Sequence, residues 1–116
     1  MKKTGRHYRD QYFDNYFDFI RRETDENRRK EGKKPYSDAT VKTWSTDTFY
    51  LERHESRNFL EWLKNEETFK EAEEALIRHF KGRRRNPKKD AEYYVQRMRD
   101  FKKFLEENDG RHIYLP

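Results

Sequence analysis

The sequence contains no cysteine among its 116 residues. This absence excludes a disulfide framework, a thiolate zinc site and a cysteine nucleophile. Only four glycines and three prolines are present, and such a scarcity of turn residues favours long helices over a sheet of many strands. No apolar run reaches the length of a signal-peptide core or a membrane span. We therefore expect a cytoplasmic protein without a membrane partner, whether a host, a virus or a plasmid encodes it.

Apolar residues are also scarce, at 31% of the chain, whereas charged residues make up 44%. Globular domains have roughly 45–50% apolar residues when glycine is counted, so only a thin core is expected. Aromatic residues nevertheless reach 16%, which is unusual for a disordered chain, and large rings bury much surface per residue. The composition predicts a single helical domain over residues 1–116, with a mobile N-terminus at about 1–8 and a mobile C-terminal tail at about 109–116.

Motifs of catalysis and metal binding are missing as well. The sequence has no glycine-rich phosphate loop, no GxSxG elbow and no kinase signature. Its four histidines lie far apart in the sequence and form no HxxxH or HExxH pair, so a metal site borne by one helix is not indicated. We therefore expect a protein that is not an enzyme and that holds neither a metal nor a cofactor.

The first segment, from about Arg9 to Lys30, is dominated by aromatic residues. At 100° per residue its apolar positions share one broad helical face: Tyr8, Tyr12, Phe13, Tyr16, Phe17, Phe19 and Ile20. Three aspartates fall on the opposite face, where a solvated surface is expected rather than a metal site: Asp10, Asp14 and Asp18. The segment therefore predicts an amphipathic helix that Gly32 and Pro35 terminate.

The second segment, Ser37 to Asn65, has two interpretations. A helix capped by Ser37 or Asp38 would keep a period of 3.6 residues through Val41, Trp44, Thr48 and Leu51. The stretch 39–54 is also rich in β-branched and aromatic residues, which favour strands, and a hairpin turning at 45–47 is the alternative. We favour the helix, with a break allowed near Ser56 and helical structure again over Phe59 to Lys64.

Two further helices are indicated by their start and stop signals. Thr68 and Glu71 match a T-x-x-E capping box, and Gly82 supplies the stop. Asn86 is a good N-cap and Pro87 suits the first position of the last helix, which should end before residue 108. The fold expected is mainly α, a small four-helix bundle-like domain. The alternative is an α+β fold with a hairpin at about 39–54 and a short C-terminal strand.

The strongest functional signal is the run RHFKGRRRNPKK at residues 78–89, which joins the last two helices. It holds seven Lys or Arg and no acidic residue, in a chain whose net charge is +5. A run of like charge has no packing role at a helix junction, and polyanions are its natural partners. The alternative is a solvated turn without a partner.

From this run we predict a non-catalytic nucleic-acid-binding module, for DNA in preference to RNA. Helix N-termini attract phosphate, and the basic residues beside one would contact the backbone without reading sequence: Arg78, Lys81, Arg83, Arg84, Arg85, Lys88 and Lys89. Readout of bases in the major groove needs side chains on a helix, and four residues are candidates: Lys42, Thr43, Gln96 and Arg99.

A second hypothesis is a viral or plasmid accessory protein that binds another protein or a second copy of itself. Its basis is the surplus of rings on the first helix, which would contact a partner if the core does not need them all. Four residues are the candidates for such a contact: Tyr12, Phe13, Tyr16 and Phe17.

The order of the expected helices also suggests a family. S-D-A-T-V-K-T-W opens the second helix and N-P-K-K-D-A-E-Y-Y-V-Q-R-M-R-D-F-K-K-F-L forms the last. This pattern resembles the SAM-like core-binding domain at the N-terminal side of tyrosine recombinases and phage integrases, over about residues 10–108. The matching positions are Ser37, Thr40, Trp44, Phe101, Phe104 and Leu105.

The resemblance implies that the second and fourth helices face DNA, as one half of a clamp. Two features depart from the family pattern. The second segment is several residues longer than usual, and the catalytic half with its Arg, His and Tyr residues is absent. The resemblance thus implies DNA binding without the chemistry of strand cutting and joining.

Overall fold

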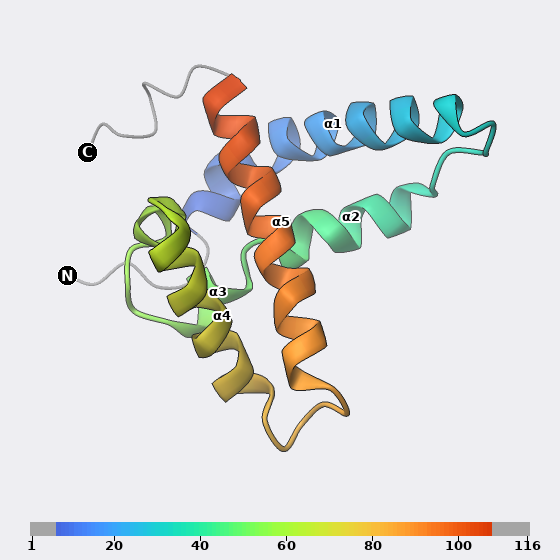
Figure 1. The fold of residues 1–116 in the computed structure, drawn as a ribbon. Coiled ribbons are helices and arrows are strands. Elements are labelled where there is room, and N and C mark those ends of the chain that lie inside the picture. The colour runs from blue at the N-terminus through green and yellow to red at the C-terminus, as the bar shows by residue number, and fades with distance from the viewer. Residues whose placement is uncertain (1–6, 108–116) are drawn as a thin grey trace.

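Five α-helices and one 3-10 helix follow one another in the computed structural model, which describes residues 7–107 (Figure 1). They are α1 (His7–Lys30), α2 (Asp38–Asp47), α3 (Tyr50–His54), η1 (Phe59–Leu63), α4 (Glu66–Phe80) and α5 (Pro87–Glu107). The described residues contain no strand, so the mainly α prediction is confirmed and the hairpin at 39–54 is not formed. The predicted C-terminal strand and tail lie outside the described residues, as do residues 1–6.

The helices are arranged as two antiparallel pairs that point in different directions. α1 packs against α2, and α4 packs against α5. α5 also contacts both helices of the first pair, so it crosses the molecule and holds the pairs together (Figure 1). The α1–α2 connection and the α4–α5 connection therefore lie at separate ends of the fold. None of the described helices is both long and apolar enough to cross a bilayer.

Aromatic rings supply ten of the 21 buried hydrophobic residues of the core, in line with the composition. Tyr16 is completely buried, and rings from other elements meet its ring edge to face. The centroid distances are 5.9 Å to Phe49, 5.2 Å to Phe101 and 5.6 Å to Phe104. Such arrangements are favourable beyond the area that they bury. A few large side chains thus join α1, the α2–α3 turn and α5 despite the low apolar content.

The second predicted segment is three short helices rather than one. Ser37 caps α2 as predicted, because its hydroxyl accepts a hydrogen bond from the Thr40 amide at 3.2 Å. α2 ends at Asp47, and the next residues, Thr48 and Phe49, are buried with no exposed surface. The Thr48 hydroxyl lies 3.0 Å from that of Tyr16. Contacts to the core, which the helical period does not encode, thus decide where α2 stops.

The remainder of this segment departs from a regular helix. Glu55 is extended after α3, with φ −128° and ψ 148°, which confirms a break at the predicted place near Ser56. The helical structure predicted over Phe59 to Lys64 is present as the 3-10 helix η1 at Phe59–Leu63. Asn58 begins it, because its side-chain oxygen accepts from the Leu60 amide at 2.9 Å.

Helix α4 begins one turn earlier than the sequence indicated. The Asn65 side chain accepts from the Thr68 amide, and the Thr68 hydroxyl accepts from the Asn65 amide, both at 3.0 Å. The capping box predicted for Thr68 and Glu71 is therefore wrong, since Thr68 is the inner member of the box. Glu71 forms an ion pair with Arg57 at 2.8 Å.

Helix α1 also begins earlier, at His7 rather than Arg9. Its N-terminus is closed by Glu52 of α3, a side chain that is only 2% exposed. The Glu52 carboxylate accepts hydrogen bonds from the backbone amides of Tyr8 at 2.5 Å and Arg9 at 3.0 Å. A carboxylate at this position satisfies free amides and complements the helix dipole. Glu52 is more than forty residues from the start of α1 in the sequence, so no local pattern predicts this cap.

Candidate nucleic-acid interface

The α4–α5 connection is a tight turn that presents basic side chains to solvent. Gly82 has a positive φ of 79°, which favours glycine. The amides of Arg83 and Arg84 both donate to the Phe80 carbonyl, at 2.9 and 3.0 Å. Asn86 then caps α5 as predicted, accepting from the Lys89 amide at 3.2 Å. The turn is thus held by backbone bonds to Phe80 at one end and by the side-chain cap of Asn86 at the other.

The seven cations of the run fall into two groups. Arg84 and Lys88 have acidic partners: Arg84 lies 3.5 Å from Asp90, and Lys88 lies 3.6 Å from Glu73. The other five side chains are exposed and form no hydrogen bond or ion pair within the described part of the chain: Arg78, Lys81, Arg83, Arg85 and Lys89. These five, which we name the unpaired cations, remain available to bind phosphate.

Arg84 has a different role from its neighbours. Its guanidinium carbon lies 4.1 Å from the centre of the Phe80 ring, and one nitrogen donates to the Tyr94 hydroxyl at 3.3 Å. Together with the Asp90 ion pair, these contacts fix Arg84 across the start of α5. It therefore orients the turn rather than standing free at its surface.

Two histidines that are remote in sequence meet beside this turn. The rings of His54 and His79 are 5.6 Å apart, and the Tyr50 ring contacts both. Burial lowers the pKa of His54, and the nearby positive charges of His79, Arg53 and Arg83 lower it further. The carboxylate of Glu55 lies 2.7 Å from the His79 ring nitrogen Nε2. The described residues contain no group of three or more side chains that could hold a metal.

The residues predicted to read bases do not share one surface. Lys42 and Thr43 are exposed on α2, where the Thr43 hydroxyl donates to the Ala39 carbonyl at 3.0 Å. Gln96 is exposed on α5 and donates to Asp100 at 3.2 Å. Arg99 lies towards α4 rather than α2.

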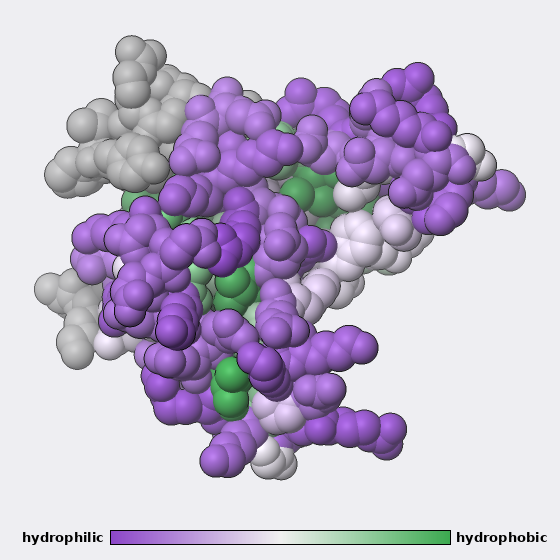
Figure 2. Space-filling model, in the orientation of Figure 1, coloured by the Kyte–Doolittle hydropathy of each residue, from purple (hydrophilic) through white to green (hydrophobic). Residues whose placement is uncertain are grey.

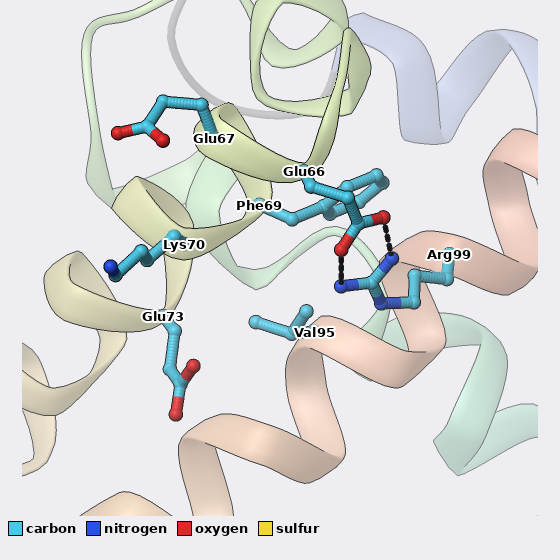
Figure 3. A pocket seen from close by; sticks show the side chains of 7 residues that line it. All are labelled: Glu66, Glu67, Phe69, Lys70, Glu73, Val95 and Arg99. Atoms are coloured by element: carbon cyan, nitrogen blue, oxygen red, sulfur yellow. Dashed lines mark hydrogen bonds and ion pairs between the residues drawn. The ribbon is translucent and has the colours of Figure 1, made fainter.

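The placement of Arg99 follows from its ion pair with Glu66. Two guanidinium nitrogens donate to the two carboxylate oxygens at 2.5 and 2.8 Å (Figure 3). α2 instead meets α5 through Arg97, whose guanidinium carbon lies 5.7 Å from the Trp44 ring centre. Residues two apart on a helix point about 200° apart, so Arg99 and α2 lie on opposite sides of α5.

A cavity of about 400 Å³ adjoins this ion pair between α4 and α5. Its lining contains three carboxylates, two cations and two apolar side chains: Glu66, Glu67, Glu73, Lys70, Arg99, Phe69 and Val95 (Figure 3). The acidic excess repels phosphate.

The aromatic residues of α1 are divided between core and surface. Tyr16 is fully buried and cannot contact a partner, which corrects its place in the protein-interaction hypothesis. Tyr12 packs edge to face on Phe101 at 5.9 Å. Phe13 stacks on Phe17 at 6.4 Å, and both are half-buried. The three aspartates on the opposite face are exposed, as predicted: Asp10, Asp14 and Asp18.

No family model matches the chain, and neither a curated protein nor a solved structure was found to be significantly similar to it.

Proposed function

We propose that the protein is a non-catalytic nucleic-acid-binding module, with DNA as the preferred partner. The observation that carries the proposal is the set of five unpaired cations at the α4–α5 turn. Cations elsewhere in the described chain often have an acidic neighbour, as Arg21 has in Asp25 and Asp38. Clustered cations without internal partners repel one another, and phosphate relieves that repulsion.

Salt dependence is the first test, because phosphate contacts release counterions. Five contacts imply a slope of log affinity against log salt of roughly −4 to −5 on B-DNA. Fluorescence anisotropy with a labelled random-sequence duplex, titrated across a salt series, measures this slope. The double substitution Arg83→Gln and Arg85→Gln should make it less steep by about 2. Arg84 is left unchanged because it holds the turn in place.

A matched control removes the same charge elsewhere. Arg22 of α1 and Lys70 of α4 are exposed and, like the five unpaired cations, form no ion pair within the described residues, and Arg22→Gln with Lys70→Gln should leave the slope close to that of the wild type. If the slope became less steep by the same amount in both double variants, the effect would arise from net charge alone, and the turn would not be the binding site. Absence of binding at low salt to both the duplex and a matching single strand would reject the function itself.

The resemblance to core-binding domains remains a prediction, and we include it in the proposal together with a cytoplasmic location. The helical fold is compatible with it. The basic turn lies at the N-terminus of α5, the helix that the resemblance would turn towards DNA. No family match adds to this support.

The protein-interaction hypothesis now involves fewer residues of α1. With Tyr16 in the core, the half-buried Tyr12, Phe13 and Phe17 are the residues left for a contact with a protein partner or a second copy. Light scattering at high concentration tests self-association, and a monomer would exclude a second copy on this face.

A further inference from the structure

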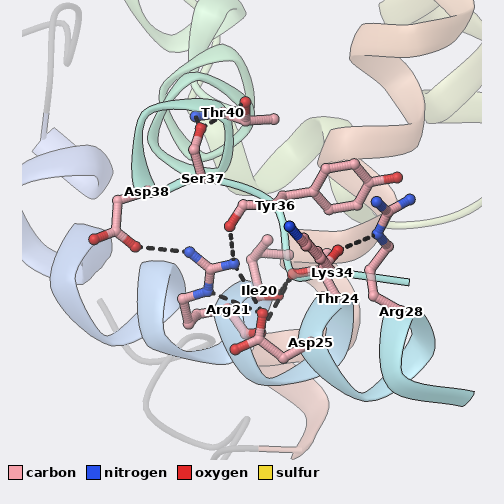
Figure 4. Close-up of polar contacts among 10 residues, drawn as sticks. All are labelled: Ile20, Arg21, Thr24, Asp25, Arg28, Lys34, Tyr36, Ser37, Asp38 and Thr40. Carbon is pink, nitrogen blue, oxygen red and sulfur yellow. Dashed lines mark hydrogen bonds and ion pairs between the residues drawn. The ribbon is translucent and has the colours of Figure 1, made fainter. Parts of the chain in front are cut away.

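A line of alternating cationic and aromatic side chains connects the two helix pairs. It starts at the end of α1, where the guanidinium carbon of Arg28 lies 4.3 Å from the centre of the Tyr36 ring (Figure 4). The Tyr36 ring meets Trp44 of α2 edge to face at 4.8 Å. Arg97 of α5 lies 5.7 Å from the Trp44 ring and 5.3 Å from the Tyr93 ring. We name these five residues the cation–aromatic strip.

The strip continues to the basic turn. The Tyr93 and Tyr94 rings are 5.2 Å apart, and the guanidinium carbon of Arg84 lies 5.4 Å from the Tyr94 ring. Contacts of this kind therefore run without a gap from the α1–α2 end of the molecule to the α4–α5 end. The α1–α2 end is also basic, with Lys33 and Lys34 exposed there.

The five residues of the strip are partly exposed, whereas Tyr94, through which they connect to Arg84, is buried with 7% of its surface exposed. Tyr36, Trp44 and Tyr93 are all half-buried, in contrast to Trp62, which is 3% exposed. Figure 2 shows the surface hollowed between the lobes that carry the two connections, with paler residues along the hollow and hydrophilic residues on its rims. The three rings, which come from the α1–α2 connection, α2 and α5, are therefore partly open to a ligand.

Acidic groups near the strip are already engaged. Asp47 accepts a hydrogen bond from the Tyr93 hydroxyl at 2.9 Å, and Asp100 pairs with Arg97 at 3.0 Å. At the other end, Arg21 pairs with both Asp25 and Asp38 (Figure 4). Arginines pair with Asp25, Asp38 and Asp100, and the positive charges of Arg84 and Arg97 act on Asp47, so these carboxylates do not exclude an anionic strand.

We propose that the cation–aromatic strip is a stacking surface for unpaired bases, so that the preferred ligand is a single strand whose phosphates reach the unpaired cations. This inference rests on the proposed function and makes it more specific. Aromatic rings and guanidinium planes stack on bases of any sequence. Bases within a duplex are stacked on one another, so their faces are closed to such a surface. DNA and RNA single strands present the same chemistry, and the test includes both.

An abasic strand separates stacking from phosphate contact. We would compare dT12 with a twelve-residue abasic strand of the same number of phosphates, at one salt concentration, by competition against labelled dT12. Stacking of a single base should already make dT12 bind about five- to a hundred-fold more tightly than the abasic strand. U12 should show the same advantage over the abasic strand, and a 12-base-pair duplex should bind less tightly than dT12.

Intrinsic fluorescence identifies the surface. Trp62 is buried, so Trp44 is the tryptophan that a stacked base would quench, and dT12 should quench it while the abasic strand should not. Trp44→Leu should reduce the difference between dT12 and the abasic strand by at least about five-fold. Tyr36→Leu is a second variant at a position outside the helices. Phe13→Leu is the matched control, because Phe13 is another half-buried ring but lies off the strip.

The outcomes distinguish this inference from the proposed function. Equal affinity for dT12 and the abasic strand, or tighter binding of the duplex, would overturn the stacking surface while the basic turn remained a phosphate site. Loss of the base-dependent advantage in Phe13→Leu as much as in Trp44→Leu would also overturn it. No binding of any of the probes at low salt would reject the proposed function and the inference together.

Discussion

At the residue scale, Glu52 shows how a charged side chain can be structural in a thin core. Its carboxylate is 2% exposed and is tied to the backbone amides of Tyr8 and Arg9. Burial of a charge is costly unless hydrogen bonds compensate it. The first turn of α1 provides such bonds, and in return its free amides are satisfied across more than forty residues of sequence.

Replacement of Glu52 should therefore destabilise the fold. Glu52→Ala leaves two amides without this acceptor, and we expect a loss of about 1.5–3 kcal/mol in the free energy of unfolding, as for hydrogen bonds to charged groups. Glu52→Gln keeps an acceptor oxygen and should lose less. Urea denaturation measures both, and an unchanged midpoint for Glu52→Ala would show that the cap contributes nothing in solution.

His54 gives the fold a dependence on pH. Its pKa is lowered in the folded protein by burial and by the positive charges of His79, Arg53 and Arg83. As pH falls through about 6.5, the unfolded chain takes up the proton first, so the free energy of unfolding decreases. We expect the difference in the free energy of unfolding between wild type and His54→Gln to be constant above pH 7.5. From pH 7 to 5 the wild type should lose stability relative to the variant. A difference that stays constant over the whole range would contradict this assignment.

At the scale of single elements, the α4–α5 turn depends on one backbone conformation. Gly82 has a φ of 79°, and a Cβ atom added there would meet nothing within 4 Å. The same is true of Gly32, with a φ of 71°, at the end of α1. Any cost of a side chain at these positions therefore arises from the left-handed backbone and not from a clash.

This equivalence makes the two glycines matched controls for each other. Gly82→Ala and Gly32→Ala should each reduce the free energy of unfolding by about 1 kcal/mol, while Gly82→Asn should cost less, because asparagine tolerates this conformation. Thermal denaturation compares the three variants. A loss at residue 32 with none at residue 82 would mean that the turn does not hold the left-handed conformation in solution.

At the scale of the whole molecule, the Tyr16 hydroxyl joins three segments. It lies 3.0 Å from the Thr48 hydroxyl and donates to the Arg97 carbonyl at 3.2 Å, while its ring meets Phe101 and Phe104. Burial raises the pKa of Tyr16 well above its usual value. One side chain thus sets where α1, the end of α2 and α5 converge.

Removal of the Tyr16 hydroxyl should destabilise the fold, and the loss should depend on its hydrogen-bond partner Thr48. Tyr16→Phe keeps the ring and should reduce the free energy of unfolding by about 1–2 kcal/mol, since each buried hydrogen bond contributes roughly 0.5–1.5 kcal/mol. A double-mutant cycle with Thr48→Val tests whether the two hydroxyls are coupled. The loss in the double variant should differ from the sum of the two single losses by at least about 0.5 kcal/mol. Strict additivity would show that the two hydroxyls are not coupled.

Local signals were sufficient for several elements. Asn86 followed by Pro87 located the start of α5, and Ser37 located the start of α2, because a cap satisfies amides within its own turn. The aromatic face of α1 was also readable, since ring positions repeat with the helical period. The basic turn itself followed directly from the order of residues 78–89.

Other features needed contacts that no local pattern encodes. The sequence indicated Thr68 as the N-cap of α4. In the structure Asn65, three residues earlier, is the N-cap, because Asn65 and Thr68 each accept a hydrogen bond from the other's backbone amide. The end of α2 depends on Tyr16, more than thirty residues away. At the site, the sequence did not separate Arg84, which is held by Asp90 and an aromatic pair, from neighbours that are free.

The sequence by itself determined the helical class of this protein, its aromatic core and the basic connection between its last two helices. These depend on side-chain type and on spacing within one or two turns. The tertiary structure alone decided which cations remain unpaired and which rings stay at the surface. Both are differences between burial and exposure, and they are fixed by which helices meet rather than by what any one helix contains. The joining of Arg28 to Arg84 through the strip exists only because α5 crosses α2.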